Sequence, residues 1–453
     1  MARFGRVLAL IVLLGCAVRV GYVLVVVGDE PLQGDQIFYT GTANRLAQGH
    51  GFVYPYDEAR NELRVGTIPA ADHPPLTVLV LAPVAWLLDH VPGADVDTRR
   101  GNNHAFAFRL TFAVLGSVTV LLVGLLGREV AGDRVGLIAA GIAALYPNLW
   151  VNDGLVMAET LTLIFTALIL LLVYRYRRAP TAPMAIAIGV ACGLAALTRS
   201  EMILFAPCIA LPVLLASPVR TGRERVGRVG VASLALVVVV APWVTFNLTR
   251  FEEPTFLSTN DGQTLLGANC PDAYSGAAVG MWLLDCLQAL PGDQSQVSSE
   301  SRRLAVEFMR ENRDRLPAVV AIRVARLWNV YAADRMVSYN AGEGRLPWIS
   351  RVGLWSFYPL ALLAVAGVYA LRRAWSKLWP LLTVVVLVSV VAAVTYGQMR
   401  LRVPAEVSVV VLAAVAIDAI ARKLSSSIGR PTGPGHYAEA ARSREGAATG
   451  VGS

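Results

Sequence analysis

The stretch "PPLTVLVLAPVAWLLDHV", Pro74 to Val91, decides how the rest of this sequence is arranged, because it is apolar yet poorly suited to cross a membrane. It is shorter than the roughly 20 apolar residues that a spanning helix needs, and it carries Pro83, Asp89 and His90. Whether it crosses sets the side of the membrane on which every later loop lies. The apolar runs and the charges around it therefore have to settle the choice.

The composition indicates a membrane protein. The chain has 453 residues, of which 55% are hydrophobic and 16% are charged, whereas soluble domains have about 25% charged residues. Its mean hydropathy is +0.54. The net charge of +8 does not indicate a nucleic-acid partner, because most basic residues lie in short clusters between apolar runs, which is how membrane proteins are oriented. We expect an all-α polytopic membrane protein that contacts lipid.

Ten apolar runs are near the length that a bilayer requires, so we expect about 10 transmembrane helices, within a range of 9–12. The runs cover residues 7–27, 106–127, 134–150, 159–174, 184–198, 202–216, 229–247, 352–371, 378–396 and 404–421. In the first run, "LLGC" at Leu13 to Cys16 resembles a lipoprotein cleavage box. The run nevertheless continues to Val27, which is too long for a signal-peptide core, so we expect an uncleaved span.

Counting the crossings settles the role of Pro74 to Val91. If this stretch does not span, every short basic connection lies on the same side of the membrane, as the positive-inside rule requires. These connections contain Arg3 and Arg6, Arg128 and Arg134, "RYRR" at Arg175 to Arg178, "RTGRERVGR" at Arg220 to Arg228, "LRRAWSK" at Leu371 to Lys377, and Arg422 with Lys423. If it spans, almost all of them move outside. We therefore expect an amphipathic or re-entrant helix at the outer leaflet.

This topology predicts a plasma-membrane protein with both termini in the cytosol. Residues 1–424 form one transmembrane domain, with outer loops at 28–105, which contains juxtamembrane helices, and at 248–350. The tail, residues 425–453, is rich in Gly, Ser and Ala and poor in large apolar residues, so we expect it to be disordered.

Ionisable residues gather at the outer face of this topology. Such groups at a membrane face are costly unless they pair or line a wet cavity, so together they indicate a functional site. For any single Arg, snorkelling of a long side chain to the interface is an equally good explanation. The set comprises Asp29, Glu30, Asp35, Asp72, His73, Asp153, Glu159, Arg199, Glu201, Arg400 and Arg402.

Motifs of soluble enzymes and metal sites are missing from the sequence. It has no phosphate-binding Gly loop with a Lys, and its five His have no metal-ligand spacing to each other or to Cys. The adjacent acids Asp29 and Glu30 are a weak signal for a divalent cation. We therefore expect no metal and no cofactor.

The five Cys fall into two groups. Cys16, Cys192 and Cys208 lie in apolar runs and are typical packing residues. Cys270 and Cys286 lie in the second outer loop. Because the outside is oxidising, we expect these two to form a structural disulfide.

Several motifs together resemble one family of membrane enzymes. In chain order they are "GDQIFY" at Gly34, "DHPPL" at Asp72, "NDGLVMAETL" at Asn152, "GLAALTRSE" at Gly193 and "MRLRVPAE" at Met399. The set resembles the GT-C membrane glycosyltransferases, in particular the protein O-mannosyltransferase and lipid A aminoarabinose transferase superfamily. The resemblance covers residues 1–250 well and 350–421 more loosely. Two positions depart from it: Gln36 stands where the family usually has Glu, and His73 stands where a basic residue often precedes Pro-Pro.

The resemblance implies transfer of a hexosyl or pentosyl group from a polyprenyl-phosphate carrier to an acceptor hydroxyl on the outer face. The acceptor would be a protein, a lipid or a cell-envelope glycan. We expect Asp35 to be the general base. One carboxylate that acts without a covalent intermediate implies inversion at the anomeric carbon, whereas retaining hydrolases use a second carboxylate as nucleophile. Asp153 or Glu159 is expected to orient the acceptor or an Arg. The departing phosphate is expected to be bound by His73, Arg199, Arg400 and Arg402. Tyr39, beside Phe38, is expected to line the sugar site.

Two other functions stay open. A flippase or transporter of polyprenyl-linked lipid or glycan would need charged or broken helices near the membrane midplane, often in repeated halves. The sequence has no visible repeat, and Arg19 and Asp418 are among its few charges near mid-span. A lipid-linked polymer ligase or polymerase is closer in chemistry and is not distinguished by the sequence.

Overall fold

The computed structural model of the chain describes residues 2–55, 68–90, 103–216, 218 and 221–428. These residues form helices and connecting turns, and their β pairing is limited to an isolated bridge between Val53 and Pro69. The expected all-α class is confirmed. The tail from residue 429 onward and parts of the first outer loop lie outside the described residues, so the expected disorder of the tail stays a prediction.

Seven helices of the described chain are long and apolar enough to cross a membrane, and an eighth crossing is possible if a bent pair counts as one. The seven are α1 (Ala2–Tyr22) with its continuation η1 (Val23–Val27), α4 (Asn103–Ala131), α7 (Glu159–Arg178), α10 (Gly222–Leu248), α15 (Pro347–Leu371), α16 (Trp375–Val394) and α17 (Val403–Ile428), which follows the turn η9 (Met399–Arg402). The bent pair is α5 (Asp133–Leu145) with α6 (Pro147–Trp150) and η3 (Val151–Gly154), and its bend is 63°. The bend lies at Pro147, whose ring cannot continue the helix before it.

The two remaining apolar runs form shorter helices. They are α8 (Ala182–Ala196) and the interrupted segment of η4 (Ser200–Leu204), η5 (Ala206–Ala210) and α9 (Leu211–Ala216). All ten expected runs are therefore helical, although fewer than ten have the full length of a span. A turn that ends at Arg199 separates α8 from the interrupted segment, and Glu201 lies in the first turn of that segment.

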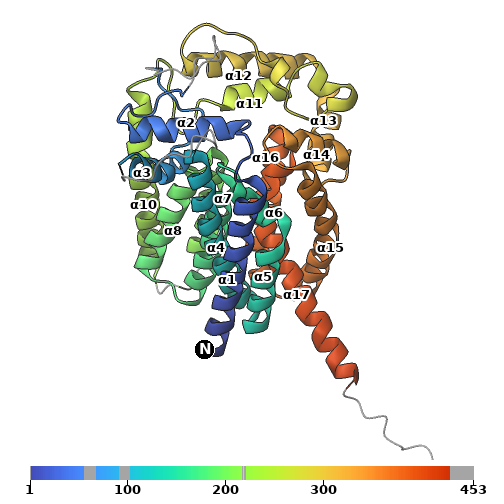
Figure 1. The fold of residues 1–453 in the computed structure, drawn as a ribbon. Helices are drawn as coiled ribbons and strands as arrows, with labels where there is room; N and C mark the ends of the chain where they lie inside the picture. Colours follow the sequence, from blue (N-terminus) through green and yellow to red (C-terminus); the bar gives the residue numbers. More distant parts are fainter. Residues whose placement is uncertain (1, 56–67, 91–102, 217, 219–220, 429–453) are drawn as a thin grey trace, which may run out of the picture.

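The short apolar stretch after Pro74 forms α3 (Leu76–His90), whose two ends lie at the same end of the bundle. The backbone N–H of Leu76 donates to the carbonyl oxygen of Leu197, just after α8. Asp89, near the other end of α3, lies 3.2 Å from Nε2 of His104 in the first turn of α4. The chain passes down α4 and up α8 in Figure 1, so both anchors of α3 lie at the upper end. The helix is therefore folded against the bundle without passing through it.

The bundle has two different ends (Figure 1). At one end, which we call the basic end, ion pairs and hydrogen bonds join the connections between helices. Arg178 pairs with Glu129 at 2.6 Å, Arg134 pairs with Asp418 at 3.1 Å, and Arg177 donates to the carbonyl oxygen of Ser376. The N-terminus and the last turns of α17 lie at this end. The expected grouping of the basic connections is thus present in the fold.

At the other end, which we call the loop end, α2 (Asp35–Ala47) lies across the bundle beneath a cap of shorter helices. The cap consists of α11 (Asp261–Ala268), α12 (Gln294–Glu311), α13 (Leu316–Leu327) and α14 (Ala333–Ala341). Asp293 begins α12 with a capping box to Gln296. Cys270 and Cys286 form a disulfide between α11 and α12.

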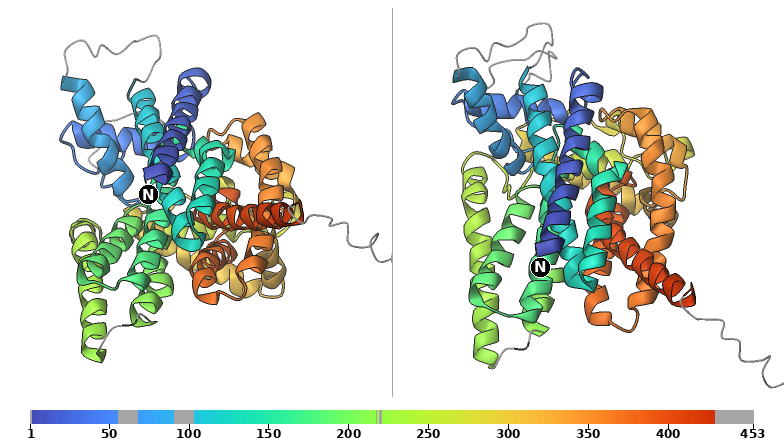
Figure 2. Two further views of the ribbon diagram at one scale, coloured as in Figure 1. Left: turned by 90° about the horizontal axis from the view of Figure 1, so that it is seen from below. Right: turned by 60° about the horizontal axis from the view of Figure 1, so that its bottom comes forward.

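Small residues let the long helices approach each other closely. In Figure 2, α8 and α10 form one flank of the bundle and α15 lies on the opposite flank. A side chain at Gly189 would overlap the backbone of Ala232 in α10, and one at Gly367 would overlap the backbone of Leu412 in α17. Backbone contact of this kind is typical of helix packing in membranes. It makes a firm frame for the polar residues at the loop end.

Candidate active site

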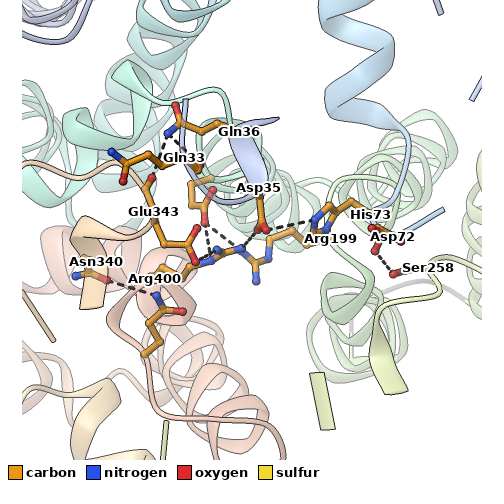
Figure 3. Close-up of polar contacts among 12 residues, drawn as sticks. Gln33, Asp35, Gln36, Asp72, His73, Arg199, Ser258, Asn340, Glu343 and Arg400 are labelled. Carbon is orange, nitrogen blue, oxygen red and sulfur yellow. Dashed lines mark hydrogen bonds and ion pairs between the residues drawn. The ribbon is translucent and has the colours of Figure 1, made fainter. Parts of the chain in front are cut away.

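Arg400, in the turn η9 before α17, contacts three carboxylates from distant parts of the chain (Figure 3). Its Nη2 lies 2.6 Å from Oδ2 of Asp35, its Nε lies 3.2 Å from Oε1 of Glu159, and its Nη1 lies 2.7 Å from Oε1 of Glu343. Asp35 is the first residue of α2 and Glu159 is the first residue of α7. An acid in the first turn of a helix is favoured by the positive end of the helix dipole.

A second arginine shares one of these acids. Nη1 of Arg199 lies 3.3 Å from Oε1 of Glu159, and its Nε lies 2.6 Å from Oε1 of Glu201. Burial alone would lower the pKa of Arg199, but Glu201 and Glu159 outweigh it and raise that pKa. Glu159 is 1% exposed and lies between two guanidinium groups. The turn before η4 is thus joined to the same cluster.

His73 and Tyr39 form the third side of the cluster. Nε2 of His73 lies 3.7 Å from Oδ1 of Asp35, and the His73 ring stacks on the Tyr39 ring with centroids 4.9 Å apart. Burial alone would raise the pKa of Asp35, but Arg400 and His73 outweigh it and hold that pKa well below its ordinary value. Burial likewise opposes the charge on His73, but Asp35 outweighs it and raises the pKa of His73. Asp35 is therefore ionised at neutral pH.

Asp72, next to His73, fixes the first outer loop to the second. The hydroxyl of Tyr54 donates to its carboxylate, and Oγ1 of Thr259 donates to Oδ1 at 3.4 Å. Ser258 donates to the backbone carbonyl oxygen of Asp72 (Figure 3). Burial raises the pKa of Asp72. These bonds hold the residue before His73 in place.

Glu343 is a site residue that sequence reasoning missed. It lies between Gly342 and Gly344, just after α14, and its carbonyl oxygen accepts from Nε2 of Gln36 at 3.2 Å. Burial raises the pKa of Glu343, although Arg400 opposes that rise. The only signal in the sequence was an acid between two glycines in "AGEGR", in the second outer loop. Such a pattern is too common to indicate a site by itself.

Gln36, the residue after Asp35, has a structural contact on each side. Besides its bond to Glu343, its Oε1 accepts from the backbone N–H of Val156 at 3.2 Å. It is 0% exposed. An amide can donate and accept at the same time, which a carboxylate cannot do. Gln36 therefore fixes α2 to the turn before α7 and to the loop after α14.

Two expected site residues lie in ion pairs of their own. Oδ2 of Asp153 lies 2.7 Å from Nε of Arg19, and its Oδ1 accepts from Thr160 at 2.7 Å. Nε of Arg402 lies 2.8 Å from Oε1 of Glu406. The structure therefore brings together Asp35, Tyr39, His73, Glu159, Arg199 and Arg400, and it places Asp153 and Arg402 among the helices.

The reason for these placements is local. Arg400 and Arg402 are two residues apart in a tight turn, so their side chains leave it in different directions. Arg402 lies over the ring of Phe357 at 3.6 Å, within the bundle. Asp153 is the partner of Arg19, the mid-span charge in the first helix, which also donates to the carbonyl oxygens of Ala143 and Ala144. A buried charge in a membrane helix requires such a partner.

No group of three or more His, Cys, Asp or Glu side chains is placed to hold a metal ion among the described residues. The carboxylates of the cluster contact guanidinium groups instead. The expectation of no metal and no cofactor stays a prediction.

One stretch of the chain is similar to a known protein family. Residues 98–246 match the family model described as dolichyl-phosphate-mannose-protein mannosyltransferase. No curated protein matches the chain in sequence.

Among solved structures, the apo oligosaccharyltransferase of Archaeoglobus fulgidus superposes with a TM-score of 0.53 at 16% identity, covering 94% of this chain and 52% of that one. The oligosaccharyltransferase AglB of the same organism, in complex with an inhibitory peptide and a dolichol-phosphate, gives a TM-score of 0.50 at 15% identity, covering 95% and 52%. ArnT of Cupriavidus metallidurans bound to undecaprenyl phosphate gives 0.42 at 15% identity, covering 90% and 78%. The chain spans about half the length of the oligosaccharyltransferases.

Proposed function

Because this chain has the fold of the GT-C membrane glycosyltransferases, we propose that it transfers a sugar from a polyprenyl-phosphate carrier to an acceptor hydroxyl at the loop end of its bundle. The observation that carries this proposal is the contact of Arg400 with Asp35, Glu159 and Glu343. The cluster contains Arg400 and Arg199, which are cations suited to a phosphate, and Asp35, which is an ionised carboxylate suited to an acceptor hydroxyl. It lies where the apolar bundle meets the polar loops.

The arginines suit the phosphate of the donor. The departing phosphate gains negative charge in the transition state, and fixed positive groups that face it lower the barrier. Arg400 and Arg199 are 10% and 15% exposed in their side chains, so they are partly shielded from water while remaining within reach of a ligand. The guanidinium fork matches two phosphate oxygens at once. The polyprenyl tail would then lie along the apolar helices beneath.

Asp35 suits the acceptor. The acceptor hydroxyl gives its proton to Asp35 as its oxygen bonds to the anomeric carbon, while the bond from that carbon to the phosphate oxygen breaks and its electron pair leaves with the phosphate. A carboxylate with a very low pKa is a weak base. A bound phosphate would accept hydrogen bonds from the N–H groups of Arg400 that now face Asp35, and the pKa of Asp35 would rise as a result. Binding of the sugar donor would therefore make Asp35 a stronger base. Tyr39 would line the sugar site beside it, and His73, when protonated, would add to the positive charge that faces the phosphate.

The substitution Asp35→Asn tests the assignment, because it keeps the shape of the side chain and removes its basicity. We expect turnover from a polyprenyl-phosphate sugar in nanodiscs to fall by about a hundredfold to ten-thousandfold. Binding of undecaprenyl phosphate should persist, since Arg199 and Arg400 remain. Glu30→Gln is the matched control, because Glu30 is an exposed acid in the same outer loop, and it should leave turnover unchanged.

Near wild-type turnover of Asp35→Asn, with loss of turnover in Glu159→Gln, would show that the base is misassigned. The acceptor class is tested separately by mass spectrometry of outer glycans, glycolipids and glycoproteins from a deletion strain. A missing glycoform identifies the acceptor. An unchanged glycome with a lipid intermediate trapped inside the cell would favour a transporter.

A further inference from the structure

The turn that carries Arg400 is held by the second outer loop. This turn, residues 395–402, joins α16 to α17. The three residues before Arg400 each contact that outer loop. The backbone N–H of Gly397 donates to the carbonyl oxygen of Gly280 at 2.8 Å, and Nε2 of Gln398 lies 3.5 Å from Oδ1 of Asn340. Met399 packs in an apolar cluster with Met281 and Met336.

Two buried arginines of α13 fix the part of the loop that meets this turn. Nε of Arg326 donates to the carbonyl oxygen of Val279 at 2.7 Å, and its Nη2 donates to that of Ala277 at 2.9 Å. Arg323 donates to the carbonyl oxygen of Ala268 at 2.6 Å and to that of Ala393, at the end of α16, at 3.2 Å. A buried guanidinium is costly unless hydrogen bonds satisfy its donors, so these contacts strongly favour one loop geometry.

Close backbone approach leaves no room for a side chain at the contact. A Cβ at Gly397 would overlap the carbonyl oxygen of Arg323, and one at Gly280 would lie 3.2 Å from Cγ2 of Ile322. Gly280 also has a φ of +78°, which side chains rarely adopt. The turn and the loop are therefore packed against α13 through their backbones.

The disulfide between Cys270 and Cys286 closes the segment that contains Gly280, and we call residues 270–286 the disulfide loop. We propose that the disulfide loop positions Arg400, with Gly397 and Arg326 as its positioning residues, so that an intact disulfide supports binding of the donor phosphate. This proposal rests on the proposed function for its link to the donor. Its structural part, the hold of the loop on the turn, is independent of that function.

Hydrogen–deuterium exchange tests the structural part without any assay of transfer. The full chain in nanodiscs is compared before and after reduction, and with the double variant Cys270→Ser, Cys286→Ser. We expect faster amide exchange in residues 395–402 when the bridge is absent, while α7 stays unchanged. Unchanged exchange in that turn would overturn the proposal.

Gly397→Ala tests the link to the donor. Because a misplacement of about 1 Å can cost about a hundredfold in rate, we expect kcat/KM to fall by about that factor, mainly through a higher KM for the donor. Gly141→Ala, where no atom lies within 4 Å of the new Cβ, is the matched control and should behave as wild type.

A double-mutant cycle separates positioning from loss of stability. If Gly397 acts through Arg400, then adding Gly397→Ala to the variant Arg400→Lys should lower kcat/KM for the donor little further. If the two residues act independently, their effects on the free energy of activation should add. Additive losses would overturn the positioning role. If the wild-type chain neither binds undecaprenyl phosphate nor transfers sugar, the proposed function fails, but the exchange experiment still decides whether the disulfide loop holds the turn.

Discussion

At the scale of single residues, opposite charges keep the cluster charged in spite of burial. Asp35, with a side chain 27% exposed, keeps its negative charge because Arg400 and His73 lie beside it. Burial opposes the charge on His73, but Asp35 outweighs it and raises the pKa of His73. The ion pair between them adds stability that is fully present at pH values below the ordinary pKa of His, near 6.5. That stability is lost as the pH rises through the raised pKa of His73.

The charge of His73 should appear in the pH profile. His73 is titratable and would add positive charge beside the donor phosphate only when it is protonated, so the KM for the donor should rise as the pH passes the raised pKa of His73. His73→Gln should abolish this dependence, and His73→Lys should move it to higher pH, since the ordinary pKa of Lys is near 10.4. His50→Gln, an exposed histidine of the same loop, is the control. A basic limb that persists in His73→Gln would show that another group titrates.

The site could be predicted in part. Acids and arginines at the ends of apolar runs, such as Asp35, Glu159 and Arg199, were visible because a membrane makes such charges costly. Glu343 was not visible, because it lies in a long polar loop where an acid has no such cost. The different directions of Arg400 and Arg402 also could not be foreseen, since they depend on the geometry of one tight turn.

At the scale of elements, the hydrophobic pattern predicted every helix that is long and apolar enough to cross a membrane among the described residues, because length and apolarity are what a bilayer selects. It did not predict the break at Pro147 or the interruption of the run 202–216 into η4, η5 and α9, both of which depend on local turns. The charge pattern was more informative than hydropathy for α3. Hydropathy alone would have made a span of it, whereas its ends contact Leu197 and His104 at the loop end.

The contact between η3 and α1 gives a prediction about Asp153. Arg19 is 0% exposed, so Asp153→Asn would leave a buried cation without its counter-charge, which typically costs about 3–5 kcal/mol. We expect a clear fall in the melting temperature in detergent, with an unchanged KM for the donor in the protein that remains folded. Asp314→Asn, at an acid whose side chain is 97% exposed, should leave melting unchanged. Lost turnover at an unchanged melting temperature would instead place Asp153 in the chemistry.

At the scale of the whole molecule, the two ends of the bundle differ in chemistry. The basic end joins the helix connections through arginines, and the loop end holds the acids and their cap. The positive-inside rule assigns the basic end to the cytosol, so the cluster around Arg400 is predicted to face outward.

Labelling with a membrane-impermeant thiol reagent checks this orientation. Single cysteines are introduced in a chain in which Cys16, Cys192 and Cys208 are replaced. Glu311→Cys and His90→Cys, both exposed at the loop end, should react from outside in intact cells. Arg373→Cys, exposed at the basic end, should react only after the membrane is opened. Protection of position 311 together with outside labelling of position 373 would reverse the topology.

The contact between Asp35 and Arg400 also has a consequence for biosynthesis, because the two residues are 365 positions apart. At a synthesis rate of about 5 to 20 residues per second, Asp35 leaves the ribosome roughly 20 to 70 s before Arg400 exists. During that interval α7 enters the membrane and α2 reaches its outer surface, each with an acid that lacks the cation the two share. A nascent chain is therefore expected to stay loosely assembled at its outer surface, and open to quality-control proteases, until the last helix is inserted.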